Sequence, residues 1–401
     1  MKTKNILQIL MLSGVLIFSS CSKNSSTPAV LGCTDPCSVE YNADADTDDG
    51  SCTYGYISMF TDPTDTVNNP STVSFGGQTA RLHMVGEMMS AMNDETTTES
   101  MLTSMFNNSG YMWSSAVALA ATDKRLENKV NDVDQEINLA MLSFANDVAP
   151  AVANGDVASS GVAGSLTAIN PDGSQGRTVK VNAKGMELNQ VFAKCLIGAL
   201  CVDQIANVYL ASGKMNVSND DRPGYTTMEH HFDEGFGYLY GLDCSGTGVA
   251  LTSGDILLNK YLGKVVSNEP MIAVNTYDNF RDGRQAIVDM DYTKRDAHIA
   301  TICSNISRVV AYKAISYLDG ASAELIANGV TPDFIHDLSE GYGFIYSLQF
   351  TKVDGAPYFD NNWVKGKLDA LKAGNGFWDV TPAQLDAIRD EIIAKDPLFG
   401  L

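Results

Sequence analysis

The stretch HHFDEGFGYLYGL at residues 230–242 recurs as HDLSEGYGFIYSL at residues 336–348. Six of the thirteen aligned positions are identical, and four more exchange similar side chains. An apolar segment lies upstream of each stretch at nearly the same offset, and in these segments Cys195, Ala206, Tyr209 and Leu210 correspond to Cys303, Ala314, Tyr317 and Leu318. Each half of the chain is therefore expected to contain a long helix, a connection and a His/Glu helix.

This repeat predicts an all-α fold of two similar helical bundles that arose by internal duplication, with the two repeated helices facing one another. From residue 76 onward, apolar side chains return every three or four positions, which is the helical period. Long helices are expected through Leu188–Tyr209 and Ile299–Tyr317, and shorter ones at 78–92, 133–147, 225–242, 276–289, 331–350, 362–373 and 381–394. Residues 150–180 are rich in Gly, Ser and Asn, which favours a long surface loop or a short hairpin.

A polar and small-residue stripe follows each repeated helix. The helical period aligns His230, Glu234, Gly237 and Gly241 in one copy, and His336, Glu340, Gly343 and Ser347 in the other. Glycine inside a helix costs about 1 kcal/mol relative to alanine. The repeated glycines therefore indicate either a tight helix crossing or a ligand pressed against the backbone.

Three of the five histidines carry a glutamate four residues later, where chance predicts fewer than one such pair. Imidazole and carboxylate together suit iron, zinc or manganese, so a transition metal is one interpretation, with candidate ligands His230, His231, Glu234, His336 and Glu340 and a second candidate pair His83 and Glu87. Three tyrosines would line or cap the ligand, namely Tyr238, Tyr240 and Tyr346. The other interpretation is a buried, hydrogen-bonded bridge that fixes the two bundles in register.

The N-terminus has the layout of a lipoprotein signal, predicted over residues 1–20. Lys2 and Lys4 precede an apolar run, and Ser19-Ser20 precede Cys21. Lipidation of Cys21 would anchor the chain through the tether 21–31 without a transmembrane helix. Ser22, rather than aspartate, follows this cysteine, which favours the outer membrane and leaves open which face the protein occupies. The net charge of −21 argues against nucleic acid as a partner.

A small Cys-bounded acidic module is expected at residues 32–54, ahead of the helical body. Its motifs GCTDP (32–36), YNAD (41–44) and DDGSC (48–52) resemble a module of exported proteins from Gram-negative gliding and marine bacteria. The resemblance implies a disulfide between Cys33 and Cys52. It leaves open the pairing of Cys37, Cys195, Cys201, Cys244 and Cys303. Alternating carboxylates suit either a calcium loop or a solvated acidic turn, and the candidate ligands are Asp44, Asp46 and Asp48.

Four motifs resemble the exported bacterial lipoprotein family known as domain of unknown function 4856, over about residues 55–396. They are GGQTARLHMVGEMMSAM (76–92), NVYLASGKMNV (207–217), YTTMEHHFDEGFGYLYG (225–241) and LSEGYGFIYSL (338–348). The duplicated domain would then occupy residues 55–401, with halves near 76–255 and 256–396. The family implies a setting beside imelysin-like proteins and outer-membrane receptors. HFDE at 231–234 is similar to part of the G-x-H-x-x-E signature of imelysins, with Glu229 in place of the glycine.

Together these features favour a lipid-anchored helical binding protein that takes part in metal, chiefly iron, acquisition at the cell envelope. One alternative is a structural lipoprotein that docks to an outer-membrane receptor, or to an imelysin-like protein, without metal. Another is a metal-dependent hydrolase with Glu234 or Glu340 as its base. The chain lacks H-E-x-x-H, G-x-S-x-G and a phosphate-binding glycine loop, so a binding role is favoured over an enzyme.

Overall fold

The structure is a computed structural model of the 401-residue chain. It describes residues 29–34, 42–49, 51, 55–65, 67–68, 70–114, 119, 122–221, 224–242 and 256–400. The predicted signal 1–20, most of the tether and the cysteines Cys21, Cys37, Cys52 and Cys244 lie outside these residues. Lipidation of Cys21 and the Cys33–Cys52 pairing therefore stay predictions.

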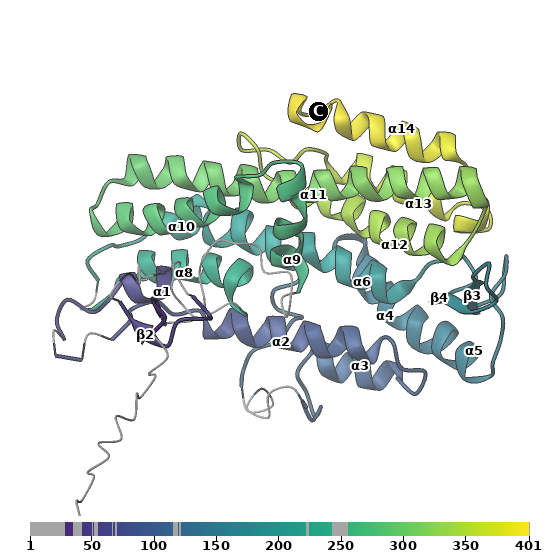
Figure 1. The fold of residues 1–401 in the computed structure, drawn as a ribbon, viewed down its shortest axis with the longest axis horizontal. Helices are drawn as coiled ribbons and strands as arrows, with labels where there is room; N and C mark the ends of the chain where they lie inside the picture. The colour runs from purple at the N-terminus through teal and green to yellow at the C-terminus, as the bar shows by residue number, and fades with distance from the viewer. Residues whose placement is uncertain are drawn as a thin grey trace, which may run out of the picture.

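The described part of the chain is mostly helical, which confirms the all-α prediction (Figure 1). Its longer helices are α2 (Gly76–Ala91), α3 (Glu99–Phe106), α4 (Glu136–Ser143), α6 (Leu188–Leu196), α8 (Thr227–Tyr240), α9 (Leu257–Lys264), α10 (Ile272–Val288), α11 (Tyr292–Asn328), α12 (Pro332–Ser347), α13 (Asn361–Lys372) and α14 (Pro382–Ile393). Three shorter helices are α1 (Tyr56–Met59), α5 (Ala149–Ala153) and α7 (Ser212–Met215). The helices α3 and α9 were not expected from the sequence.

Threonine begins both repeated helices. The Thr226 side chain accepts a hydrogen bond from the backbone N–H of Glu229 at the start of α8, and the Glu229 carboxylate accepts one from the backbone N–H of Thr226. Thr331 accepts one from the N–H of Phe334 at the start of α12, where Pro332 occupies a position that needs no donor. These caps satisfy backbone N–H groups that have no partner inside the helix. The two helices therefore share their starting chemistry as well as their sequence.

A single continuous helix, 22 residues long, runs from Leu188 to Tyr209. Its first part is α6, and its second part, η4 (Ile197–Tyr209), has π-helical hydrogen bonding. By length and composition it is the one helix among the described residues that could cross a membrane, but 89% of its most apolar window is buried inside the protein. Such burial is what the core helix of a folded body shows.

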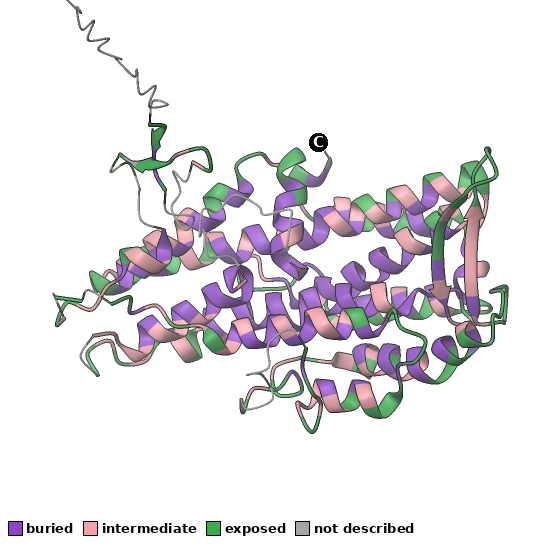
Figure 2. Ribbon diagram, turned by 60° about the horizontal axis from the view of Figure 1, so that its bottom comes forward, coloured by how far each residue is buried: buried purple, intermediate pink, exposed green. Residues whose placement is uncertain are grey.

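The two repeated helices pack on opposite parts of this long helix. α8 contacts η4, α2 and α10, whereas α12 packs mainly on α6 and α11 and also reaches the beginning of η4. Figure 1 shows α8 towards one end of the molecule and α12 towards the other, with α6 between them. The expectation that the repeated helices face one another is therefore wrong, because the long helix lies between them. One hydrophobic core draws residues from both halves of the chain. The buried residues, purple in Figure 2, run through the middle of the helical body.

Two small sheets complete the described structure. β3 (Gly164–Ile169) and β4 (Gln175–Val181) form an antiparallel hairpin, which confirms the hairpin alternative for residues 150–180. In the N-terminal module, β1 (Leu31–Gly32) pairs in parallel with β2 (Thr47–Asp48). Cys33 follows β1 and is buried and disulfide-bonded.

The carboxylate of Asp46 forms hydrogen bonds within the N-terminal module. It accepts hydrogen bonds from the backbone N–H of Val30 and from the Thr47 hydroxyl, both at 3.0 Å. Asp44 donates its backbone N–H to the side chain of Asn42. Asp44 and Asp46 lie just before β2 and Asp48 lies within it. Calcium binding by these residues stays a prediction.

Candidate functional site

The glycines of the two repeated helices make equivalent contacts. A Cβ atom added to Gly235 would lie 3.2 Å from Leu210, and one added to Gly341 would lie 3.3 Å from Tyr317. Tyr317 and Leu210 belong to the residues matched between the two long helices. The duplication inferred from the sequence is therefore also present in the packing.

A second pair of glycines explains the small-residue stripe. A Cβ atom on Gly237 would clash with Phe75 and Gln78 of the α2 region, and one on Gly343 would clash with Lys194 of α6. Of the two meanings considered for these glycines, the structure shows the tight helix crossing. Each repeated helix crosses a different partner, α2 in the first copy and α6 in the second.

The second copy of the His/Glu pair lies in a buried ion-pair network. The Lys194 ammonium is 2.8 Å from Glu340 Oε1, and both side chains are almost wholly buried. His336 Nδ1 is 2.7 Å from Glu187 Oε2, and His336 Nε2 is 3.5 Å from Glu340. The Tyr261 hydroxyl donates to the other oxygen of Glu340 at 3.3 Å. Both oxygens of this carboxylate are thus occupied by protein groups.

The pKa of Glu340 reflects this network. Burial alone would raise it, but the charge and hydrogen bond of Lys194, together with a hydrogen bond from Tyr317, outweigh burial and bring the pKa to about 2. Burial also lowers the pKa of the Lys194 ammonium, so desolvation offsets part of the attraction between the two groups. In this copy the pair acts as the bridge that was one of its two interpretations.

The first copy is open. His230 Nε2 lies 3.9 Å from Glu234 Oε2, and the two side chains keep 31% and 20% of their surface exposed. Gln78 Nε2 donates to Glu234 Oε1 at 3.1 Å. His230 Nδ1 is buried and has no hydrogen-bond partner among the described residues. Both side chains line a pocket of about 450 Å³ beside the start of α2.

Cationic side chains dominate the charged lining of this pocket. Arg81, Lys124 and Lys129 line it together with Tyr209, against the single carboxylate of Glu234. The Lys129 ammonium donates to the Tyr209 hydroxyl at 2.8 Å. Burial lowers the pKa of Lys129, and the Arg81 guanidinium lowers it further, while Glu234 opposes both.

In each copy the glutamate interacts with the tyrosine that the alignment matches, Glu234 with Tyr209 and Glu340 with Tyr317. Burial and then the charge and hydrogen bond of Glu234 raise the pKa of Tyr209, and burial and Glu340 do the same for Tyr317. This is a further equivalence that the aligned sequences could have suggested, because Tyr209 and Tyr317 were matched in them.

The other predicted metal ligands have different surroundings. His231 turns to Lys214, with Nδ1 3.1 Å from the Lys214 carbonyl oxygen. Glu87 accepts hydrogen bonds from the Tyr111 hydroxyl and the Ser114 backbone N–H. No group of three or more His, Cys, Asp or Glu side chains is placed to hold a metal ion in the part of the chain that the structure describes. The candidate ligands are thus divided between separate places.

The predicted ligand-lining tyrosines lie in the core. Tyr238, Tyr240 and Tyr346 are each 1% exposed. The Tyr238 ring lies 5.9 Å from that of Tyr209, and the Tyr346 hydroxyl donates to the Val133 carbonyl at 3.0 Å. The two cysteines that match in the repeat, Cys195 and Cys303, are also buried, and neither forms a disulfide. Cys201 is buried as well. The tyrosines and the cysteines named here therefore contribute to the packing of the core.

A buried arginine cluster was missed from the sequence. The Arg284 guanidinium lies 2.7 Å from Glu229 and 3.1 Å from Asp233, and the Tyr56 hydroxyl donates to Asp233 at 2.7 Å. Burial raises the pKa of Asp233 to about 6, although Arg284 and Tyr56 oppose the rise. The cluster joins α1 and α10 to α8. Only the i, i+4 spacing of Glu229 and Asp233 could have indicated it.

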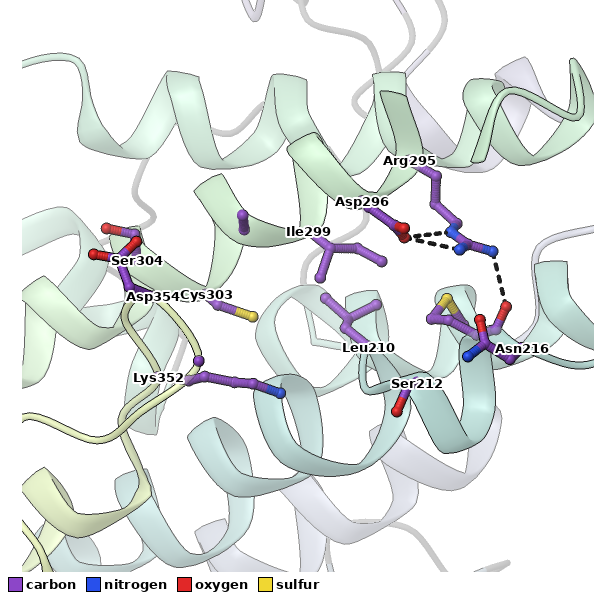
Figure 3. A pocket seen from close by; sticks show the side chains of 13 residues that line it. Leu210, Ser212, Asn216, Arg295, Asp296, Ile299, Cys303, Ser304, Lys352 and Asp354 are labelled. Atoms are coloured by element: carbon purple, nitrogen blue, oxygen red, sulfur yellow. Dashed lines mark hydrogen bonds and ion pairs between the residues drawn. The ribbon is translucent and has the colours of Figure 1, made fainter. Parts of the chain in front are cut away.

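A second pocket of about 330 Å³ lies between Leu210, α11 and the segment 352–355 (Figure 3). Its cations have partners. Arg295 turns to Asp296 at 2.8 Å and donates to the Met215 carbonyl (Figure 3), and the Lys352 ammonium donates to the Ala206 carbonyl. The pocket beside His230 and Glu234 is therefore the stronger candidate site. The sequence analysis missed the three cations that line this pocket beside His230, because the spacing of Arg81, Lys124 and Lys129 shows no recognised pattern.

Comparison with known proteins bears on the family alone. No curated protein and no solved structure matches this chain. The family model described as Domain of unknown function (DUF4856) matches residues 65–401, so the chain belongs to that family.

Proposed function

We propose that this protein is a non-catalytic binding protein of the cell envelope that takes part in metal acquisition, with iron as the first candidate. Its binding site is the pocket beside His230 and Glu234. The observation that carries the proposal is the open first copy, where an imidazole and a carboxylate line a 450 Å³ pocket. In the second copy, Lys194 and Glu187 occupy the same two groups.

The donor types in the pocket support a transition metal. The buried Nδ1 of His230 has no partner among the described residues, Glu234 is partly exposed, and Tyr209 lines the same pocket. Imidazole nitrogen and carboxylate oxygen are common ligands of iron and zinc. His230, Glu234 and Tyr209 would hold the metal, which would supply the binding energy of a capture site.

The cellular setting of the proposal comes from the sequence. Cys21 would carry the lipid anchor, and residues 21–31 would hold the folded body away from the outer membrane. An outer-membrane receptor or an imelysin-like protein would be its partner, as the family resemblance implies. A structural docking lipoprotein is the second candidate function, favoured by the buried network of Lys194, Glu340 and His336, which joins α6 to α12.

The test compares the two copies. Wild type, His230→Ala and His336→Ala proteins are purified, their metal content is measured by mass spectrometry, and their melting temperatures are recorded with and without ferric or zinc salts and chelates. We expect metal-dependent stabilisation in wild type and in His336→Ala, and its loss in His230→Ala. Wild-type protein without metal and without any shift in melting temperature would overturn the proposal.

A further inference from the structure

Arg81 is a buried cation without an acidic partner among the residues that the structure describes. It is 6% exposed, and no carboxylate of a described residue lies within 4.0 Å of its guanidinium. Its Nε and Nη1 donate to the backbone carbonyls of Arg125 and Gly77. By contrast, the buried Arg284 and Arg295 each have a carboxylate partner. Buried charges are normally paired, so Arg81 at the wall of a pocket indicates a missing anion.

The start of α2 adds backbone donors to the same pocket. Ser74, Phe75, Gly76 and Gly77 line it, and the N-cap Phe75 has no side chain that could cap the helix. The first N–H groups of a helix have no acceptor within it, and the helix dipole favours negative charge there. The backbone at Gly76 is exposed, with open space where a Cβ atom would stand.

The balance of charge around the pocket disfavours a bare cation. Three cationic side chains line it against the carboxylate of Glu234, which already accepts a hydrogen bond from Gln78. Lys124 has an exposed partner in Asp123 at 2.6 Å, whereas Lys129 is bonded to the neutral hydroxyl of Tyr209. A free metal ion would bring further positive charge beside Arg81 and Lys129. An anion would neutralise them.

We infer that this pocket recognises a small multivalent oxyanion of the polycarboxylate or phosphate class, with Arg81, Lys129 and the start of α2 as its partners, so that metal enters as an anionic complex. The inference deepens the proposed function, on which its metal part rests. A volume of about 450 Å³ lies in the range of small-molecule sites. The lining divides into oxyanion partners on α2 and Lys129, and metal donors at His230 and Glu234.

The experiment is calorimetric titration of the full mature chain with four probes: citrate, inorganic phosphate, ferric citrate and zinc chloride. Lys129→Gln is the main variant, because its partly exposed side chain can be replaced without opening the core. Lys313→Gln is its matched control, since Lys313 lies over the ring of Tyr317 in the second copy, 4.4 Å from the ring centre. Arg81→Gln is the second variant, used if its melting temperature shows that it folds.

We expect citrate and ferric citrate to bind wild type and the control alike, and at least tenfold more weakly to Lys129→Gln. Tighter binding of ferric citrate than of citrate, lost in His230→Ala, would support the metal function as well. Equal binding of both would leave the oxyanion site standing and overturn metal acquisition. Binding of zinc chloride without either anion would overturn the oxyanion site and leave metal capture. Phosphate alone would identify a phosphate site, and no binding by any probe would overturn both.

Discussion

In the second copy of the repeat, the crossing helix α6 brings a lysine to Glu340, whereas in the first copy α2 brings a glutamine to Glu234. Both crossings are close, because Gly237 and Gly343 each leave no room for a Cβ atom. Duplication has therefore kept the crossing and changed its polar partner. An ammonium neutralises a glutamate, but an amide only hydrogen-bonds it. The side chain of Glu340 is 8% exposed and that of Glu234 is 20% exposed, so one copy became structural while the other stayed open to a pocket.

The largest expected effect comes from removing the lysine. Lys194→Met should lower the free energy of unfolding by about 3–5 kcal/mol, because it leaves the Glu340 carboxylate buried without its cation. The matched change Gln78→Met in the first copy should cost about 1 kcal/mol, since Glu234 stays partly hydrated. Urea denaturation measures both. Equal losses in the two variants would break the comparison.

Acid should reveal the same network through Glu340. Its pKa of about 2 in the folded protein lies below its ordinary 4.5, so its stabilising contribution is present above about pH 4.5 and is lost as the pH falls towards about 2. The full contribution is about 3 kcal/mol. The difference in unfolding free energy between wild type and Glu340→Gln should therefore shrink across that window. A difference independent of pH would show that Glu340 is not held ionised by Lys194.

The shared crossing is probed by Gly237→Ala and Gly343→Ala. Each added methyl group meets side-chain or backbone atoms that must move, at a cost of about 1–3 kcal/mol. Gly366→Ala in α13 is the control, because a Cβ atom there meets nothing within 4 Å, and it should stabilise the helix by up to about 1 kcal/mol. Thermal unfolding compares the three variants. A large loss in only one copy would contradict the equivalence of the crossings.

The smallest change in stability is expected at the cations of the open copy. Lys129→Gln should alter the unfolding free energy by less than about 0.5 kcal/mol, because it removes a half-buried ammonium that the Arg81 guanidinium repels. At a fixed citrate concentration, the rise in melting temperature of Lys129→Gln in a thermal shift assay should nevertheless be much smaller than that of wild type. Loss of fold instead would mean that Lys129 supports the first copy as Lys194 supports the second.

Much of the helical layout could be predicted from the sequence, because apolar periodicity reports which face of a segment is buried. The helix expected at 276–289 corresponds to α10, and that expected through Ile299–Tyr317 lies inside α11, which extends to Tyr292 and Asn328. The beginning of α11 was missed since Asp291 caps it through its side chain at a position where the apolar pattern is already weak.

The site was predictable in its parts but not in its assembly. The repeat identified Glu234 and Glu340, and the spacing placed a histidine one turn before each. Periodicity carries no information about neighbours distant in the chain, so it could not show that Lys194 reaches Glu340 or that Gln78 reaches Glu234. These partners decide whether the His/Glu pair forms a buried bridge or lines an open pocket. The second copy forms the bridge, and the first copy lines the pocket.

The long helix 188–209 contributes to both copies, with Lys194 near one end and Tyr209 at the other. Between them lies the π-helical segment, whose wider turns change the rotation accumulated along the axis. Because the i→i+5 hydrogen bonds of a π-helical segment turn the chain by less per residue than the about 100° of an α-helix, this segment sets the rotation of Tyr209 relative to Lys194 around the helix axis. The orientation of the open copy relative to the closed one therefore depends on the hydrogen-bonding pattern of this shared helix. A change between π-helical and α-helical turns would rotate the contacts of one copy against those of the other.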